Sequence, residues 1–133
     1  MIVDTSALLA YFDQAEAQHA AVSAVIDAAE QCVVSPYVLA ELDYLVTSHY
    51  GREAELAILQ ELLDSDWELA HVSNDDLAEI RDVLASYGEA VGLADAANLV
   101  LARRYRHQTI ATLDRRHFSY LHLPGHPPLT VVP

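Results

Sequence analysis

The chain opens with a short apolar strand that ends in an acid and passes directly into a helix. Residues 2–3 have the apolar character of a buried strand, and Asp4 follows them. Thr5 or Ser6 is expected to cap the helix that begins at Ala7. In open sheets of parallel strands, ligands bind along the edge where the strands end. This junction therefore predicts an α/β fold in which Asp4 is a candidate for chemistry at that edge.

Strands and helices alternate along the rest of the chain. Further strands are predicted at 32–34, 67–72, 108–112 and 129–132. Helices are predicted at 7–12, 16–30, 36–50, 52–64, 75–87, 92–102 and 115–120. Such alternation favours a parallel sheet packed between helices, and right-handed crossovers then bring the carboxyl ends of the strands to one edge. The length, together with the lack of a linker or repeat, predicts a single domain over residues 1–133.

The opening junction recurs near the C-terminus. Strand 108–112 is followed by Asp114, and helix 115–120 comes next. Asp114 is thus expected at the same edge of the sheet as Asp4. Thr112 precedes Asp114 by two residues, and we expect its hydroxyl to orient a water or a carboxylate.

Two further acids lie in predicted helices. Glu41 lies beside the apolar stripe of helix 36–50, where a carboxylate costs free energy unless it is paired or binds a cation. Asp95 is the only charge in segment 92–102, whose leucines and alanines occur on all sides of the helix. A buried carboxylate there is expected to be ion-paired, protonated or metal-bound. Asn98 either extends this polar site or makes an ordinary helix contact.

Convergence of these acids at one edge would require a cation between them. Without one, the carboxylates would repel each other strongly. Hard oxygen ligands suit Mg²⁺ or Mn²⁺, and one or two such ions could hydrolyse a phosphodiester. The predicted group consists of Asp4, Glu41, Asp95 and Asp114.

The charge balance restricts how nucleic acid could bind. The chain has 20 acidic residues against seven arginines and no lysine, and its formal net charge is −13. Nucleic acid would be repelled by the molecule as a whole, so binding requires a local basic patch or bridging cations. Alternatively, clustered arginines can be the solvated end of a helix, because positive charges are favourable near helix C-termini. The arginines expected to contact phosphate are Arg103, Arg104, Arg115 and Arg116.

The acids expected to be solvated charges of loops and first helical turns are Asp64, Asp66, Asp75 and Asp76.

The sequence suits a soluble cytoplasmic protein. A single cysteine, Cys32, excludes an internal disulfide and a multi-cysteine zinc site. The first apolar run contains an acid and lacks a basic leader, so no signal peptide is expected. No run approaches the roughly 20 apolar residues of a membrane span, and we expect no membrane partner.

Four pieces of the sequence together resemble the PIN-domain nucleases, and most closely the small VapC-type toxins of bacterial toxin–antitoxin pairs. The matching pieces occur in the family order and together cover nearly the whole chain. They are residues 2–8, 35–42, 92–96 and 112–118.

This resemblance implies a three-layer α/β/α sandwich with a mostly parallel five-stranded sheet. It also implies a homodimer, a Mg²⁺- or Mn²⁺-dependent endoribonuclease acting on RNA, and an antitoxin partner whose C-terminal segment lies in or near the active-site groove. By matching position, the four acids named above would be the catalytic and metal-binding quartet, supported by Thr5 or Ser6 and by Thr112. The lack of lysine is unusual for an enzyme acting on RNA and fits a partner that contributes basic residues.

Four other functions can be compared with the sequence, and three of them conflict with particular residues. A haloacid-dehalogenase-like phosphatase would need an acid where the chain has Ser6, and a response-regulator receiver would need a lysine. A zinc site at His122 and His126 conflicts with the proline and glycine between them. A catalytically silent PIN-like binding module in a regulatory complex is the remaining alternative, although no acidic position is missing.

Overall fold

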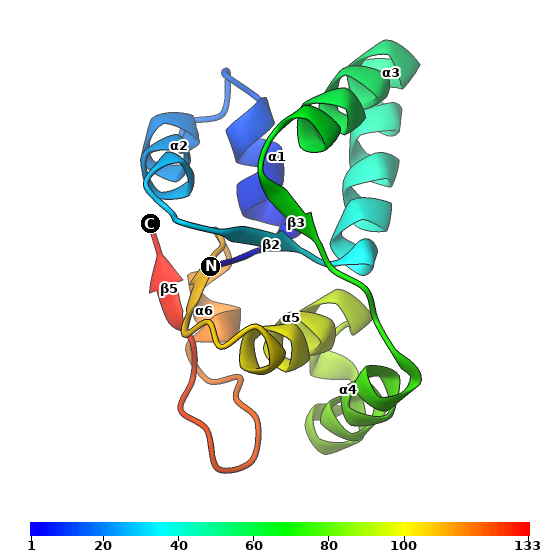
Figure 1. Cartoon of the computed structure of the whole chain (residues 1–133), viewed down its shortest axis with the longest axis vertical. Coiled ribbons are helices and arrows are strands. Elements are labelled where there is room, and N and C mark those ends of the chain that lie inside the picture. The colour runs from blue at the N-terminus through cyan, green and yellow to red at the C-terminus, as the bar shows by residue number, and fades with distance from the viewer.

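Five short parallel strands form the centre of the computed structural model, which describes residues 1–133 (Figure 1). Their order across the sheet is β3-β2-β1-β4-β5, and every neighbouring pair is parallel. Ile2 of β1 lies opposite Val33 of β2 and Ile110 of β4. The strands are β1 (Ile2–Val3), β2 (Cys32–Val34), β3 (Trp67–Leu69), β4 (Thr109–Ala111) and β5 (Thr130–Val132).

Helices cover both faces of this sheet, which gives the three-layer α/β/α arrangement expected from the sequence (Figure 1). One face carries α1 (Thr5–Phe12), α2 (His19–Asp27) and α3 (Pro36–Asp64). The other carries α4 (Asn74–Tyr87), α5 (Leu93–Arg104) and α6 (Arg115–Phe118), with a 3₁₀ turn η1 (Gly88–Ala90) after α4. None of these helices combines the length and the apolar composition that a membrane crossing needs.

Two hydrophobic cores lie on the two faces of the sheet. Successive strand residues point to opposite faces, so Ile2 joins the core beneath α4 and α5 while Val3 joins the core beneath α1 and α3. Helix α5 packs against the sheet along most of its length, and eight of its twelve residues are buried. This burial confirms the interpretation of segment 92–102 as a largely enclosed helix.

Several element boundaries differ from the sequence prediction. Helix α1 begins at Thr5 rather than Ala7, because the Asp4 carbonyl already accepts the Leu8 N–H. By contrast, the two helices predicted on either side of Gly51 are both present within α3, and they meet at a break at that glycine, whose φ is 84°. Strand β3 stops at Leu69, because its pairing partner β2 is only three residues long.

Asp76 is not a solvated first-turn charge, so that prediction was wrong. It is only 5% exposed and forms a capping box with Ser73 at the start of α4. Its carboxylate also pairs with the Arg104 guanidinium. These partners offset the cost of burying the charge.

Candidate functional site

The predicted acids surround the edge of the sheet where β1 and β4 end. From β1 the chain fills one side of the sheet with β2 and β3, and it then crosses to place β4 and β5 on the other side. Adjacent β1 and β4 therefore mark the point where the strand order reverses, which is where open α/β sheets bind ligands. Asp4 follows β1 directly, and Asp114 follows β4.

Asp4 is the buried centre of a hydrogen-bond network. It is 6% exposed, and its Oδ2 accepts hydrogen bonds from Ser6 Oγ at 3.0 Å and from Thr112 Oγ1 at 2.8 Å. Its Oδ1 accepts a hydrogen bond from Asn98 Nδ2 at 3.2 Å. The side chain makes no capping bond to α1. Three donors from three elements therefore fix the orientation of this carboxylate.

The same hydroxyls also bind the backbone beyond β4. Ser6 Oγ accepts the Leu113 N–H at 3.0 Å, and Thr112 Oγ1 accepts the Asp114 N–H at 3.0 Å. The two hydroxyls lie 3.1 Å apart. The position of Asp114 is thereby tied to the position of Asp4 across the β1–β4 junction.

Glu41 reaches this edge from the first half of α3. Thr5 Oγ1 donates a hydrogen bond to Glu41 Oε2 at 2.6 Å, so Thr5 orients this side chain as Thr112 orients Asp4. Glu41 is exposed rather than set at the boundary of the core as the helical pattern predicted. The exposed carboxylate is free to move toward a ligand.

Asp95 lies in the first turn of α5, half-buried against the other acids. Its Oδ2 accepts the Gly92 N–H at 3.0 Å, and the side chain is 24% exposed. Burial raises the pKa of Asp95, and the negative charges of Asp4 and Glu41 raise it further, while the Gly92 hydrogen bond and His117 oppose the shift. These three carboxylates therefore lie close enough to repel one another.

Asp114 is the outlying member of the predicted quartet. Its side chain is 55% exposed, and its Oδ1 caps α6 by accepting the His117 N–H at 3.0 Å. It is not among the charges that shift the pKa of Asp95. His117 lies between the two acids, with Nδ1 3.5 Å from Asp114 Oδ2 and Nε2 3.6 Å from Asp95 Oδ2.

The donor set fits a divalent cation in its chemistry, although no preformed site is present. No group of three or more His, Cys, Asp or Glu side chains is arranged so that it could hold an ion. No arginine pairs with any of the four acids, since every arginine ion pair lies elsewhere. The buried Asn98 Oδ1 beside Asp4 also accepts no hydrogen bond. Uncompensated oxygen ligands of this kind attract Mg²⁺ or Mn²⁺, and the exposed members would move inward to bind it.

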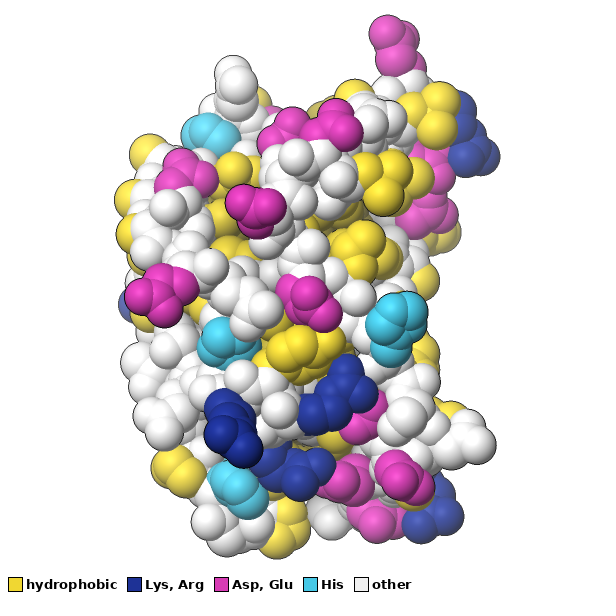
Figure 2. Space-filling model, viewed as in Figure 1, with side chains coloured by type: hydrophobic (Ala, Val, Ile, Leu, Met, Phe, Trp, Pro, Cys, Tyr) yellow, Lys and Arg dark blue, Asp and Glu magenta, His cyan; other side chains and the backbone are white.

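The four candidate arginines do not lie together. Arg103 pairs with Glu79 at 2.6 Å, and Arg104 pairs with the buried Asp76. Both end α5, about 14 Å along the helix axis from Asp95 and toward the opposite edge of the sheet. Arg115 and Arg116 directly follow Asp114, are exposed and have no ion pair. Figure 2 shows dark-blue arginine side chains in the lower half of one face, beside magenta acids.

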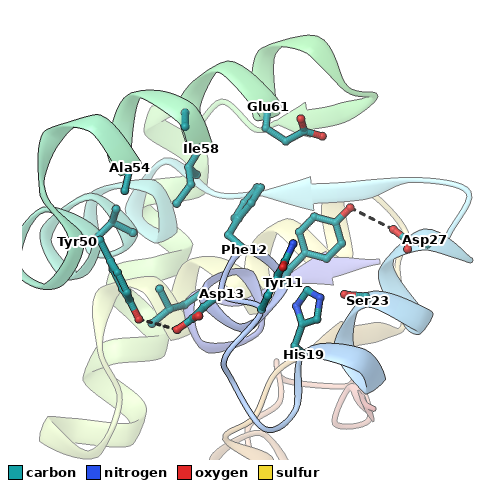
Figure 3. Close-up of a pocket in the computed structure, with 14 residues that line it drawn as sticks. Tyr11, Phe12, Asp13, His19, Ser23, Asp27, Tyr50, Ala54, Ile58 and Glu61 are labelled. Carbon is teal, nitrogen blue, oxygen red and sulfur yellow. Dashed lines mark hydrogen bonds between the residues drawn. The ribbon is translucent and has the colours of Figure 1, made fainter.

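An apolar groove lies apart from the acids, between α1, α2 and the second half of α3. Its volume is about 690 Å³, and none of the four acids lines it. Figure 3 shows Tyr50 and Tyr11 on its walls, where their hydroxyls donate to Asp13 at 2.6 Å and to Asp27 at 3.1 Å. Glu61 adds a third acid to the lining, which contains no arginine.

His117 is the residue at this edge that the sequence reasoning passed over. The signal was available, because an aspartate that caps a short helix places the third residue of that helix beside its own carboxylate. Among seven histidines without a metal-binding spacing, this pairing was not distinctive.

Known proteins are similar to this chain over nearly its whole length. The model of the PIN domain matches residues 1–121. The chain is 56% identical to Ribonuclease VapC26 of Mycobacterium tuberculosis (strain ATCC 25618 / H37Rv) over 135 residues, and the match covers 100% of both chains.

Solved structures share the fold. M. tuberculosis VapC20, described as a sarcin–ricin loop cleaving toxin, matches with a TM-score of 0.80 at 21% identity, over 95% of this chain and 98% of that one. A toxin–antitoxin complex from Klebsiella pneumoniae matches with a TM-score of 0.68 at 18% identity, over 99% of this chain and 95% of that one. Similarity at these identities bears on the fold alone, and it confirms the predicted α/β class.

Proposed function

This chain belongs to the PIN-domain family, and we propose that it is a metal-dependent endoribonuclease that acts as the toxin of a type II toxin–antitoxin pair. The observation that carries the proposal is the group formed by Asp4, Glu41 and Asp95, whose charges act on one another at the switch point of the sheet without an arginine partner. Residues 1–133 would act as one nuclease domain, in the cytoplasm where RNA is available.

Asp4, Glu41 and Asp95 would hold Mg²⁺ or Mn²⁺, with the outlying Asp114 beside them, and Asp4 would be the fixed point of the site. When bound, such an ion supplies a Lewis acid that lowers the pKa of water and offsets charge on a phosphodiester. Ser6, Thr112 and Asn98 hold the Asp4 carboxylate in one orientation before any ligand arrives. This preorganisation reduces the ordering needed when the ion and the RNA bind. Thr5 restrains the exposed Glu41 by a single hydrogen bond, which leaves that carboxylate able to move toward the ion.

Phosphate binding is assigned to Arg115 and Arg116. Both are exposed, unpaired and next to Asp114, so their guanidinium groups are free to contact RNA beside the acids. Arg103 and Arg104 are better explained as structural partners of α4, because each pairs with an acid of that helix.

We propose an antitoxin as the protein partner and the groove of Figure 3 as its binding site. This groove lies apart from the four acids, whereas the resemblance implied a segment in or near the active-site groove. The groove of Figure 3 combines apolar side chains such as Phe12 and Ile58 with acids at Asp13, Asp27 and Glu61. An amphipathic segment with basic residues would match both features.

A homodimer is also proposed, on the basis of apolar surface outside this groove. Leu56, Leu59 and Leu63 of α3 are 57%, 39% and 70% exposed, and they lie at i, i+3 and i+7 on one side of the helix. A second copy that covered this side would remove the leucines from water.

The proposal is tested by cleavage of a mixed pool of structured RNA with purified, partner-free protein. We expect cleavage with Mg²⁺ or Mn²⁺, none with a chelator, and a loss of at least about 100-fold in the Asp95→Asn variant. Asp66 is an exposed acid just before the start of β3, at the edge of the sheet away from the four acids, so Asp66→Asn should retain full activity. A fully active Asp95→Asn enzyme would overturn the assignment of this site. Absence of both cleavage and metal binding in the wild type would favour a catalytically silent binding module.

A further inference from the structure

His117 lies between Asp95 and Asp114, the acid to which the resemblance assigns a metal-binding role. Its Nε2 is buried, has no hydrogen-bond partner and lies 3.6 Å from Asp95 Oδ2. That separation is too long for a hydrogen bond. It is a separation that two ligands of one ion can span, because metal–nitrogen and metal–oxygen bonds to a transition ion are each about 2.0–2.2 Å.

The other ring nitrogen of His117 faces the second acid. Nδ1 lies 3.5 Å from Asp114 Oδ2, while the backbone N–H of the same histidine donates to Asp114 Oδ1 at 3.0 Å. Metal-binding histidines commonly present one nitrogen to the ion and direct the other N–H toward a carboxylate. Asp95, His117 and Asp114 lie in this order, and the 3.5 Å between Nδ1 and Asp114 Oδ2 would have to shorten for a hydrogen bond to form.

Packing fixes the plane of the imidazole ring. It stacks on Tyr120, with ring centroids 5.8 Å apart and planes 14° apart. The segment that follows Tyr120 is anchored to α4, because the Tyr87 hydroxyl donates to the His122 carbonyl and accepts the His122 N–H, both at 3.0 Å. The ring is therefore held in place by contacts that do not involve the acids.

From these contacts we infer that Nε2 of His117 is a ligand of the divalent ion at this edge, together with the carboxylate of Asp95, and that Asp114 acts by orienting His117. This inference rests on the proposed function, since it concerns the ion of the same site. An imidazole ligand favours transition ions over Mg²⁺, which prefers oxygen ligands and water. His117 should therefore raise the affinity for Mn²⁺ more than the affinity for Mg²⁺.

Electron paramagnetic resonance of Mn²⁺ bound to the untagged protein tests the inference without measuring activity. Spin-echo modulation should show coupling between Mn²⁺ and a histidine nitrogen, and the coupling should change when histidine is labelled with ¹⁵N. His117→Gln should remove the coupling and weaken Mn²⁺ binding at least about tenfold, while Mg²⁺ binding changes less than about twofold.

Matched variants separate this inference from the proposed function. His71→Gln removes an exposed histidine with no side-chain partner in the structure and should leave the coupling intact. Asp114→Asn keeps an oxygen that can accept the Nδ1–H, so it should weaken Mn²⁺ binding less than Asp95→Asn does. Mn²⁺ binding that depends on Asp95 but shows no nitrogen coupling would overturn the role of His117 alone. Failure of the wild type to bind Mn²⁺ would overturn both proposals.

Discussion

The side chain of Asp4 illustrates how this site departs from an ordinary strand-to-helix junction. Asp4 occupies the N-cap position of α1, where a carboxylate usually accepts an N–H of the first turn. Here it accepts hydrogen bonds from Ser6, Thr112 and Asn98 instead. Helix α1 therefore has no side-chain cap from Asp4, and the carboxylate is oriented at the edge of the sheet by these three donors.

Thr112→Val tests how much this network contributes. The change is close to isosteric and removes the hydroxyl that donates to Asp4 at 2.8 Å and accepts the Asp114 N–H at 3.0 Å. We expect a loss of about 1–3 kcal/mol in the free energy of unfolding and weaker Mn²⁺ binding by about tenfold. Urea denaturation and metal titration measure the two effects.

Thr47→Val is the matched control for this change. The Thr47 hydroxyl donates only to backbone carbonyls within α3, at 2.7 Å to Asp43, so its loss should cost less than about 0.5 kcal/mol. Equal losses in the free energy of unfolding of the two variants would show that the hydrogen bonds to Asp4 contribute no more than a hydroxyl within a helix.

Asp95 predicts a pH dependence of stability in the metal-free protein. Burial, followed by the charges of Asp4 and Glu41, raises the pKa of Asp95 in the folded state above its unfolded value. The folded state therefore binds this proton more tightly, and stability is lost as pH rises from the unfolded pKa through the raised folded pKa. Asp95→Asn, which keeps the acceptor for the Gly92 N–H, should not show this loss.

The comparison is made by urea denaturation between pH 4 and 8 with a chelator present. The difference in stability between the two proteins should be smallest near the acid end, and it should grow in favour of the variant as pH rises toward neutrality. If the free energies of unfolding of the two proteins change in parallel across this pH range, the pKa of Asp95 is not raised in the folded state.

Individual acids were predictable where their position in the chain also fixed their position in the fold. Asp4 and Asp114 follow strands, and parallel strands bring their ends to one edge whatever the side chains do. The partners of charged side chains were not predictable in this way. Asp76 and Arg104 are far apart in sequence, and only the packing of α5 against α4 brings them together.

Helix α3 shows the same distinction at the level of elements. The apolar spacing and Pro36 predicted its start, and Ser35 accepts the Val38 N–H as an N-cap. Gly51 predicted the break between helices 36–50 and 52–64, and its non-helical φ of 84° and ψ of −179° confirm that break. The strands were predictable from apolar runs, whereas their lengths depend on the partner with which each strand pairs.

Gly51→Ala measures the cost of the break in α3. The glycine has φ 84° and ψ −179°, a backbone conformation that residues with a Cβ rarely adopt. An added Cβ would meet no atom within 4 Å, so the entire cost comes from the backbone. We expect a loss of about 1–3 kcal/mol in the free energy of unfolding, measured by urea denaturation. Ser48→Ala, on the exposed side of the same helix, should be neutral, and an equally neutral Gly51→Ala would contradict the strained conformation.

At the scale of the whole molecule, the arginines that form ion pairs do so with acids away from the proposed active edge. The net charge is −13, yet Arg52, Arg81, Arg103 and Arg104 all pair with acids elsewhere. The active edge retains its negative charge, which favours a divalent ion and disfavours RNA without one. Only Arg115 and Arg116 provide unpaired positive charge next to it.

This distribution predicts an unusually weak salt dependence of RNA binding. Each phosphate contact to single-stranded nucleic acid contributes about −0.7 to the slope of log K against log salt concentration, so two arginines give a slope near −1.4. Arg115→Gln and Arg116→Gln should each reduce its magnitude by about 0.7. Arg103→Gln removes the same charge from the far end of α5 and should leave the slope unchanged. The measurement uses Asp95→Asn protein, in which cleavage is expected to be lost, at a fixed saturating Mn²⁺ concentration. A steep slope in that background, or an equal effect of Arg103→Gln, would mean that RNA binds along α5 instead. In that case Arg103 and Arg104, which the structure pairs with acids of α4, would contact the phosphates and overcome the repulsion from the acidic surface.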